Sequence, residues 1–400
     1  MTEAISTPPE LSIQPETDGR STRVDLLLDK KSISRLWLTP FTLHIGEALV
    51  RMDGVGGVGT DEAHRSHGHS RRVLEAAVEH MKRGDAALSM LYGIRDFYPK
   101  FGFATAGPDH LVQLTDLERD SALPAGWTVR PLTEDDTIAV HRIYAKNTAT
   151  AVGAAQRSVD GSVWSMLLKT AAGTKEDACR VVVGPDQAVH GYLWRASWCW
   201  YVKHTLERNF KQALVIGEVM ADSPPAADAV LAACRQWARE EAGARKFKEV
   251  VLAFPPEGPI AAAAMRQDAR LLRHYDACGG SMARVLNVKR LLEALRPELQ
   301  ARLRAARSDF AGSLVLQTDM GTTALQIDAE RVNVLDGPLP GQSVLTAALP
   351  QTELARLALG AFPPDDLLAR LPEPPGEQTS RLLEVLFPLR HPHMHLPDRY

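Results

Sequence analysis

Residues 54–68 read GVGGVGTDEAHRSHG, a glycine-rich segment followed by a short acidic loop and then by a helical pattern. That pattern ends at Gly84, and its apolar residues recur at helical spacing: Val73, Leu74, Ala77, Val78 and Met81. The first backbone N–H groups of such a helix are unpaired and carry the positive end of its dipole. A glycine at this point lets a phosphate approach the main chain closely. We therefore predict that the loop before the helix binds a pyrophosphate.

Two nucleotide-binding patterns compete for this segment. Gly54, Gly56 and Gly59 fit G-x-G-x-x-G, but that fingerprint requires a helix that begins at the glycines themselves. Here Asp61 and Glu62 intervene, so the glycines are expected to lie mostly in a strand. No Lys-Ser or Lys-Thr pair follows them, which argues against a nucleoside triphosphate loop. An NAD-dependent oxidoreductase that uses the three glycines is retained as the alternative.

The pattern Arg65-x-x-Gly68-x-Ser70 resembles the R/Q-x-x-G-x-G/A loop with which GNAT superfamily acetyltransferases hold the pyrophosphate of acetyl-CoA. Residues 58–103, with their VGT, HRSHG, RRVLEAAVEHMKRG and FYPKFGF segments, look like the first acetyltransferase domain of the enhanced intracellular survival (Eis) family. The ending FPLRHPHMHLPDRY is similar to the tail of that family. The resemblance spans about residues 24–400. It implies two GNAT-like domains followed by a sterol carrier protein-like domain.

Composition agrees with this architecture. A chain of 400 residues has room for two to three domains, and 45% hydrophobic with 24% charged residues is ordinary for a soluble globular protein. A net charge of -3 argues against nucleic-acid binding. No apolar stretch reaches the ~18 residues of a membrane span, and the N-terminus lacks the layout of a signal peptide, so we expect a cytoplasmic protein. The scattered cysteines are expected to be reduced packing residues: Cys179, Cys199, Cys234 and Cys278.

The expected fold class is α+β (α/β), divided into four segments. Residues 1–22 are expected to be disordered or loosely attached, and 23–124 to form a cofactor-binding GNAT domain. That domain is too short at its start for the strand and two helices that usually wall the acceptor site. Residues 125–288 are expected to form a degenerate GNAT-like domain, because two prolines stand where the first copy has Arg-x-x-Gly. Residues 289–400 are expected to form the sterol carrier protein-like domain.

Several elements can be placed more closely. Residues 213–220 should form the cofactor strand of the second GNAT-like domain, and strands at 249–254 and 282–288 should complete it. A helix over 288–306 should be interrupted at Pro297.

Acetyl transfer to an amine requires a positioned thioester, an unprotonated amine and a proton for the departing thiolate. Tyr98 is the candidate acid, since a phenol with a pKa near ~10 can protonate that sulfur. A tyrosine among Phe97, Phe101 and Phe103 is commonly a core residue with its hydroxyl at the surface, and the residues alone favour that role. The family resemblance favours catalysis.

The resemblance also supplies a base and a set of cofactor contacts. The base is the C-terminal carboxylate, here that of Tyr400, whose ordinary pKa of ~3.3–3.7 must be raised by burial for this role. Main-chain groups of Val58, Gly59 and Thr60 are expected to pair with the pantetheine arm. Gly93 and Ile94 match positions that flank the cofactor. The phosphate loop comprises Arg65, Ser66, His67, Gly68, His69, Ser70 and Arg71, of which Arg71 fits a solvated helix face equally well.

Other clusters are assigned structural roles. The histidines at 64, 67 and 69 and those at 391, 393 and 395 have no acidic or cysteine partner at zinc-like spacing, so no metal is expected. The aromatic group Trp194, Trp198, Trp200 and Tyr201 could form a stacking platform, but cross-strand packing in a hairpin is the favoured interpretation.

The sequence thus predicts an acetyl-CoA-dependent N-acetyltransferase with Tyr98 as acid and Tyr400 as base. By resemblance, its acceptors are amines of polycationic small molecules such as aminoglycosides, or lysine side chains, and its assembly is a homohexamer. We expect no nucleic-acid or membrane partner. The alternatives are the NAD-dependent oxidoreductase and a non-catalytic acyl-CoA or lipid-binding protein.

Overall fold

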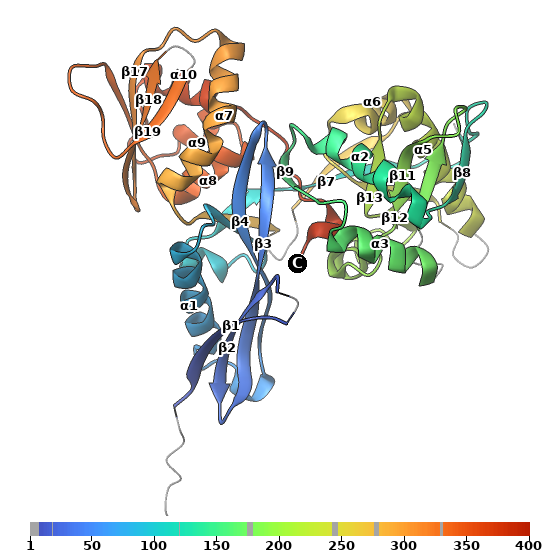
Figure 1. Cartoon of the computed structure of the whole chain (residues 1–400), viewed down its shortest axis with the longest axis horizontal. Helices are drawn as coiled ribbons and strands as arrows, with labels where there is room; N and C mark the ends of the chain where they lie inside the picture. Colours follow the sequence, from blue (N-terminus) through green and yellow to red (C-terminus); the bar gives the residue numbers. More distant parts are fainter. Residues whose placement is uncertain are drawn as a thin grey trace, which may run out of the picture. The chain divides into compact units, whose positions relative to one another are not determined.

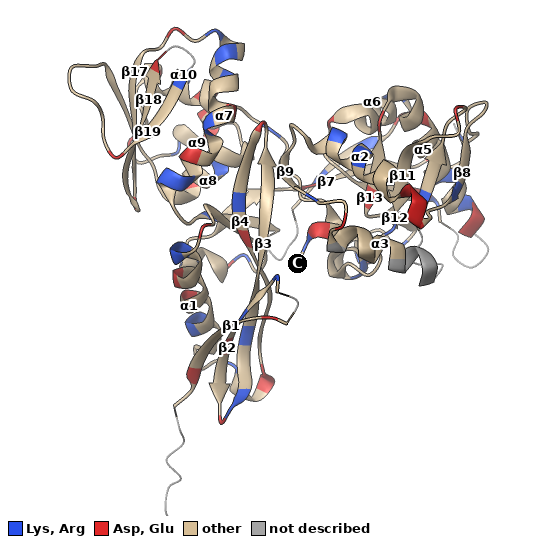
Figure 2. Ribbon diagram, viewed as in Figure 1, with Lys and Arg blue, Asp and Glu red and all other residues tan. Residues whose placement is uncertain are grey.

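The computed structural model describes residues 8–17, 19–119, 121–173, 179–241, 247–275, 280–328 and 331–400 (Figure 1). Its described residues divide into two compact units. Unit 1 comprises those of 1–107 and 280–390 together with Tyr400, and unit 2 comprises 108–275 and 391–399. Basic and acidic residues are interspersed along the elements of both units (Figure 2). Among the described residues, no helix combines the length and the hydropathy that a bilayer crossing requires.

The first sheet of unit 1 contains the glycine-rich residues 54–60, which lie in its strand β4. Its strand order is β1-β2-β3-β4-β5-β16-β6, and all neighbours are antiparallel except β4 and β5. A parallel pair needs a crossover, which α1 (His69–Arg83) provides between these two strands. The strands are β1 (Glu10–Pro15), β2 (Thr22–Leu28), β3 (Lys31–Ile45), β4 (Ala48–Thr60), β5 (Leu88–Tyr92), β6 (Ala104–Gly107) and β16 (Ser281–Val285).

The apolar stripe of α1 forms the core of this region. As predicted, the stripe is buried, and it packs against strands β2, β3 and β4. Val73, Leu74 and Met81 are 0% exposed. Burial of this stripe, rather than helix propensity, holds α1 on the sheet.

The structure corrects the prediction of a disordered start. Residues 10–15 form the edge strand β1, paired with β2, and Ile13 packs against the core of unit 1. The polar composition hid one apolar residue that reaches the core. Residues 1–7 lie outside the described part of the chain. In the described residues before α1 the one helical element is a short 3-10 turn at Glu62–His64.

The C-terminal half of unit 1 joins a helix, a second sheet and three further helices. The order of this sheet is β19-β18-β17-β20, with β17 and β20 parallel. Its elements are α7 (Val288–Ala306), β17 (Gly312–Thr318), β18 (Gly321–Asp328), β19 (Arg331–Leu335), β20 (Val344–Ala348), α8 (Gln351–Leu359), α9 (Pro364–Leu368) and α10 (Glu377–Leu386). Helix α7 continues through Pro297, contrary to prediction, because five buried leucines on one face outweigh the lost hydrogen bond: Leu291, Leu292, Leu295, Leu299 and Leu303.

Unit 2 contains two four-stranded sheets. Their orders are β13-β11-β10-β8 and β12-β14-β7-β15. The strands of these sheets are β7 (Asp109–Leu114), β8 (Thr128–Pro131), β10 (Cys179–Val183), β11 (Val189–Trp194), β12 (Ala213–Ile216), β13 (Glu218–Ala221), β14 (Glu249–Ala253) and β15 (Arg270–His274). Unit 2 also contains β9 (Val152–Ala155), which belongs to neither of them. The helices are α2 (Thr137–Thr148), α3 (Ser162–Gly173), α4 (Glu207–Asn209), α5 (Pro224–Glu240) and α6 (Gly258–Arg266).

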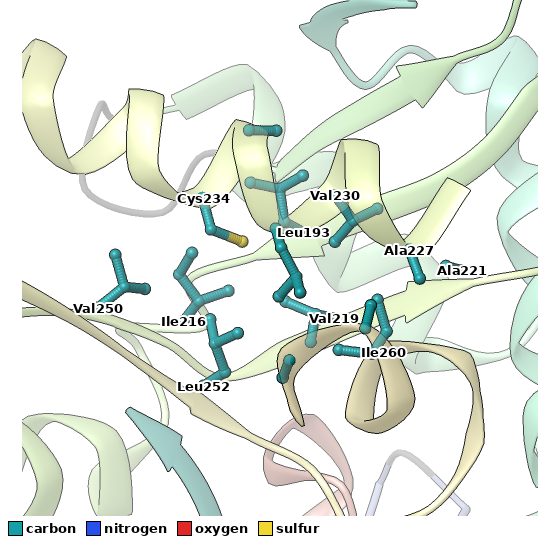
Figure 3. Packing of buried hydrophobic residues seen from close by; sticks show 14 of the residues in the cluster. Leu193, Ile216, Val219, Ala221, Ala227, Val230, Cys234, Val250, Leu252 and Ile260 are labelled. Carbon is teal, nitrogen blue, oxygen red and sulfur yellow. The ribbon is translucent and has the colours of Figure 1, made fainter. Parts of the chain in front are cut away.

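A shared core joins the elements of unit 2. Side chains of α5, such as Val230 and Cys234, meet Ile216, Leu252 and Ile260 in one cluster (Figure 3). Burial raises the pKa of the Cys234 thiol to about 12, which keeps it protonated. Cys179 and Cys199 are also buried and free, as predicted, whereas Cys278 lies outside the described residues.

Four expectations about the second GNAT-like domain and its borders are wrong. The single strand expected at 213–220 is two strands, β12 and β13, which belong to different sheets. Strand β7, expected in the first GNAT domain, pairs with β14 and β15, while β16, expected to complete the second, pairs with β5 and β6 of unit 1. The tryptophans are not a hairpin pair, since Trp194 ends β11 and Trp198 and Trp200 lie in the irregular and helical segment after it.

Candidate functional site

The candidate site begins where two parallel strands separate. The ladder between β4 and β5 runs from Met52 and Leu88 to Val55 and Leu91. Strand β4 continues beyond this point to Thr60, whereas β5 ends at Tyr92. An extended ligand could therefore add to the far half of β4 as an extra strand. Val58, Gly59 and Thr60, expected to contact the pantetheine arm, all lie in this half.

A β-bulge changes the direction of β4 inside the site. The register between β3 and β4 shifts between Arg35 and Trp37, opposite Gly57, whose φ is +60°. A Cβ at Gly57 would also lie 2.5 Å from Cε3 of Trp37. A glycine is thus required here, and the bulge re-aims the three residues that follow it. Gly57 is not among the predicted site residues, although a Gly-Gly pair inside a strand pattern is a signal of a bulge.

The predicted phosphate loop has the geometry that an anion requires. Gly68 caps α1 with φ +75°, and a Cβ placed on it would meet nothing within 4 Å. No side chain caps the helix, and its first turn carries no acidic residue. Ser66 also has positive φ, at 65°. The N-terminus of α1 therefore presents unblocked N–H groups and space for an oxyanion.

Hydrogen bonds tie this loop to the end of β4. The hydroxyls of Thr60 and Ser70 lie 2.6 Å apart, and Ser34 approaches Thr60 at 2.8 Å. Arg65 donates from Nε to the carbonyl of Thr60 at 3.3 Å. Ser70 is therefore held on the strand, while the side chains of Arg65, Ser66 and His67 are exposed.

Residues 65–71 of the predicted phosphate loop carry basic or neutral side chains, and the acidic Asp61 and Glu62 precede them. The ring of His69 stacks on His67 with centroids 5.7 Å apart, and lies 6.4 Å from that of His64. Burial, then His67, His64 and Arg72, lower the pKa of His69. Arg71 is exposed on α1. Within the described ranges, no group of three or more His, Cys, Asp or Glu is arranged to hold a metal ion.

Tyr98 lies beside the end of β5, in a 3-10 turn at Tyr98–Phe101. It is 6% exposed and forms an edge-to-face contact with Phe97 at 5.1 Å between centroids. A Cβ on Gly93 would collide with the ring of Tyr98, so Gly93 makes room for it. Burial raises the pKa of Tyr98. Ile94 is 59% exposed at the same strand end.

Tyr400, the last residue of the sequence, lies where strands β4 and β5 begin to separate. The Tyr400 hydroxyl donates to the carbonyl of Met90 at 2.7 Å, and its ring lies 5.3 Å from that of Phe41. A Cβ on Gly54 would collide with this ring, and one on Gly56 would lie 3.0 Å from the carbonyl carbon of Tyr400. These two glycines therefore serve the approach of Tyr400.

This arrangement overturns the dinucleotide alternative. Gly54, Gly56 and Gly59 all lie within β4 and not at a strand-to-helix turn. Tyr400 covers the first two. The three glycines thus lack the strand-to-helix turn that a Rossmann fingerprint requires, and Tyr400 occupies the space beside the first two.

Residues 24–106 match the family described as Acetyltransferase (GNAT) domain. Through this domain the chain is a GNAT N-acetyltransferase. Its site fits acetyl-CoA as acyl donor, because the separated strands, the bulge and the open N-terminus of α1 occur in the matched segment. No curated protein sequence matches the chain.

Solved structures show that the GNAT transferase shares its fold with proteins of similar length. The GCN5-related N-acetyltransferase from Anabaena variabilis ATCC 29413 is 17% identical with a TM-score of 0.70, covering 94% of this chain and 89% of that one. The one from Kribbella flavida is 18% identical with a TM-score of 0.67, covering 96% and 88%. Eis1 from Mycobacterium abscessus is 14% identical with a TM-score of 0.60, covering 96% and 91%.

Proposed function

We propose that this transferase acetylates primary amines at the site in unit 1, as a member of the Eis family. The observation that carries the proposal is the uncapped N-terminus of α1 at Gly68, which is tied to the free end of β4 through Thr60 and Ser70. Residues 65–71 would bind the pyrophosphate of acetyl-CoA. Residues 58–60, with Gly93 and Ile94, would flank its pantetheine arm.

Two groups at the strand separation would move the protons. The amine nitrogen attacks the thioester carbonyl, the C–S bond breaks, and the hydroxyl of Tyr98 protonates the departing sulfur. Because burial raises the pKa of Tyr98, its hydroxyl stays protonated at neutral pH. In a protein that ends at Tyr400, the terminal carboxylate beside Gly56 takes the proton from the amine. A carboxylate there also favours a cationic acceptor.

The acceptor class and the assembly come from the family resemblance. We propose amines of polycationic small molecules such as aminoglycosides, or lysine side chains, as acceptors. We further propose the three-domain arrangement and the homohexamer of the Eis family. A thiol-release assay over a panel of aminoglycosides, polyamines and lysine peptides tests the acceptor class, and sedimentation velocity tests the assembly.

Gly68→Asp is expected to weaken acetyl-CoA binding about 100-fold or more, because like charges a few Å apart near a protein surface repel by several kcal/mol. Gly68→Asn is the matched control. It has nearly the same shape and also tolerates the positive φ of this position, but it adds no charge. Calorimetric titration of acetyl-CoA into both folded variants measures the difference. Equal affinity of the Asp and Asn variants would contradict the phosphate-loop assignment.

Tyr98→Phe is expected to lower kcat by ~10²–10⁴-fold while acetyl-CoA affinity stays the same, since the ring still fills its place against Phe97 and Gly93. Tyr92→Phe, which removes a hydroxyl at the same strand end, serves as the control. Single-turnover thiol release measures the chemical step directly. A Tyr98→Phe enzyme with the wild-type single-turnover rate would make Tyr98 a core residue only.

A further inference from the structure

Unit 2 repeats the strand separation of the candidate site. Strand β12 pairs in parallel with β14 as far as Ile216 and Leu252, and the chain then leaves this sheet at Gly217 to enter β13. Gly217 directly follows Ile216, the last residue of β12 that pairs with β14, just as Gly56 follows Val55, the last residue of β4 that pairs with β5. The two glycines therefore have equivalent positions. The second separation has no phosphate loop, because α5 begins with two prolines, which lack N–H groups.

A cavity of about 170 Å³ lies at this second separation. Its walls include Val219 and Met220 of β13, and Phe254 and Pro255 just after β14. Val219 and Met220 lie as far beyond the last paired residue of β12 as Val58 and Gly59 lie beyond that of β4. Phe254 and Pro255, after β14, correspond in the same way to Gly93 and Ile94 after β5. We assign these four residues of unit 1 to the pantetheine arm. The cavity therefore exists because the strand geometry is duplicated. Without the phosphate loop, its occupant must be smaller than a coenzyme.

Histidines of the C-terminal segment line this cavity with unsatisfied ring nitrogens. His393 is 5% exposed and is fixed by its backbone N–H, which donates to the carbonyl of Val152 at 2.8 Å. Neither of its ring nitrogens has a hydrogen-bond partner among the described residues. His395 is 4% exposed, and its Nδ1 lies 3.9 Å from Glu218, beyond hydrogen-bonding distance. Buried polar atoms without partners are costly, so they point to a polar occupant.

The histidines of this cavity favour a hydrogen-bond acceptor. Burial first, and then His395, Arg399 and His110, hold the pKa of His393 well below its ordinary value, and burial lowers the pKa of His395 to about 4. Both rings are therefore neutral at neutral pH, and each offers one N–H donor. Arg399, which stays charged, pairs with Asp109. Both carboxylate oxygens of Glu218 are engaged by Arg157, at 2.9 and 2.7 Å. Glu257 also lines the cavity, but its side chain is exposed.

A helix end adds to this preference. Helix α6 begins at Gly258 in the cavity wall, and no side chain caps it. Pro259 in its first turn has no N–H, so the N–H of Gly258 and the positive end of the helix dipole are what favour a negatively charged oxygen here.

We propose that this cavity binds a short-chain carboxylate, such as propionate, between His393, His395 and the N-terminus of α6. The ring N–H groups donate to the carboxylate, and Val219, Met220 and Phe254 contact the alkyl chain. The proposal stands apart from the acetyl transfer assigned to unit 1.

The experiment titrates the full-length protein with sodium propionate and follows its melting temperature and the heat of binding. Propionate is expected to raise the melting temperature in a saturable manner, whereas propionamide, of the same shape without the charge, and sodium chloride are not. His393→Leu is expected to weaken propionate binding at least tenfold. His80→Gln, at an exposed position of unit 1, should bind as the wild type does.

Three results would overturn the proposal. In the first, propionate changes the melting temperature no more than chloride does, as expected of a cavity filled by water alone. In the second, propionamide binds as tightly as propionate. In the third, His393→Leu binds propionate with unchanged affinity. If His393→Leu does not fold, Met220→Phe reduces the cavity from the opposite wall. This variant must then also lose propionate binding.

Discussion

A protein extended by a few residues beyond Tyr400 is expected to bind acetyl-CoA as before and to acetylate amines at least ~10²-fold more slowly, the usual lower value for a lost general base. The extension turns the carboxylate next to Gly56 into a peptide group, while every side chain of the site remains. Tyr400→Phe is the matched control. It keeps the terminal carboxylate and the ring over Gly54, and removes the hydroxyl that donates to Met90.

Gly54→Ala tests the same placement from the strand. Its new Cβ would occupy the space of the Tyr400 ring, so the variant should lose transfer as the extended protein does. Single-turnover thiol release and acetyl-CoA titration separate chemistry from binding in all of these proteins. If the extended protein acetylates amines at the rate of the protein that ends at Tyr400, the carboxylate is not the base, and His67 becomes the next candidate.

Arg157→Met is expected to lower the free energy of unfolding by about 3–5 kcal/mol, because it leaves two buried carboxylates without their cation. The Arg157 side chain is 2% exposed and contacts Glu218 at 2.7 Å and Asp398 at 2.8 Å. Its guanidinium lies 3.8 Å from the ring centroid of Tyr144. Urea unfolding followed by tryptophan fluorescence measures the loss.

The controls separate charge from packing. Arg157→Met combined with Glu218→Gln and Asp398→Asn removes all three charges and should recover part of the loss. Arg266→Met breaks an exposed pair with Asp228 and an exposed hydrogen bond to the carbonyl of Ala262, so its effect should stay within about 1 kcal/mol. A destabilisation no larger than that of Arg266→Met would mean that the buried network contributes little.

The effect of Arg157 also depends on pH. Burial alone would raise the pKa of Glu218, but Arg157 outweighs it and holds that pKa below the ordinary value. The stabilisation from Glu218 is therefore present at neutral pH and lost as the pH falls through its lowered pKa. Asp398 has a raised pKa, because burial outweighs Arg157 there. The gap between wild type and Arg157→Met should thus narrow in acid.

Local signals in the sequence determined helix α1 and the glycine that precedes it. The period of the apolar residues in α1, the glycines at 68 and 84, and the absence of a Lys-Ser pair are properties of neighbouring residues. The structure has α1 at His69–Arg83 with Gly68 as its cap, because capping and helical periodicity act within a few residues.

Only the tertiary structure decided which strands pair and why several positions must be glycine. Nothing in the pattern of Ser281–Val285 distinguishes a partner in β5 from one in unit 2, since alternation reports burial and not the identity of the neighbour. Gly54 and Gly56 fit a dinucleotide fingerprint by spacing, yet they accommodate Tyr400 from the other end of the chain. His393 likewise has no local feature that places it at a cavity. Contacts between distant residues depend on how whole elements pack, and short-range sequence patterns do not record that packing.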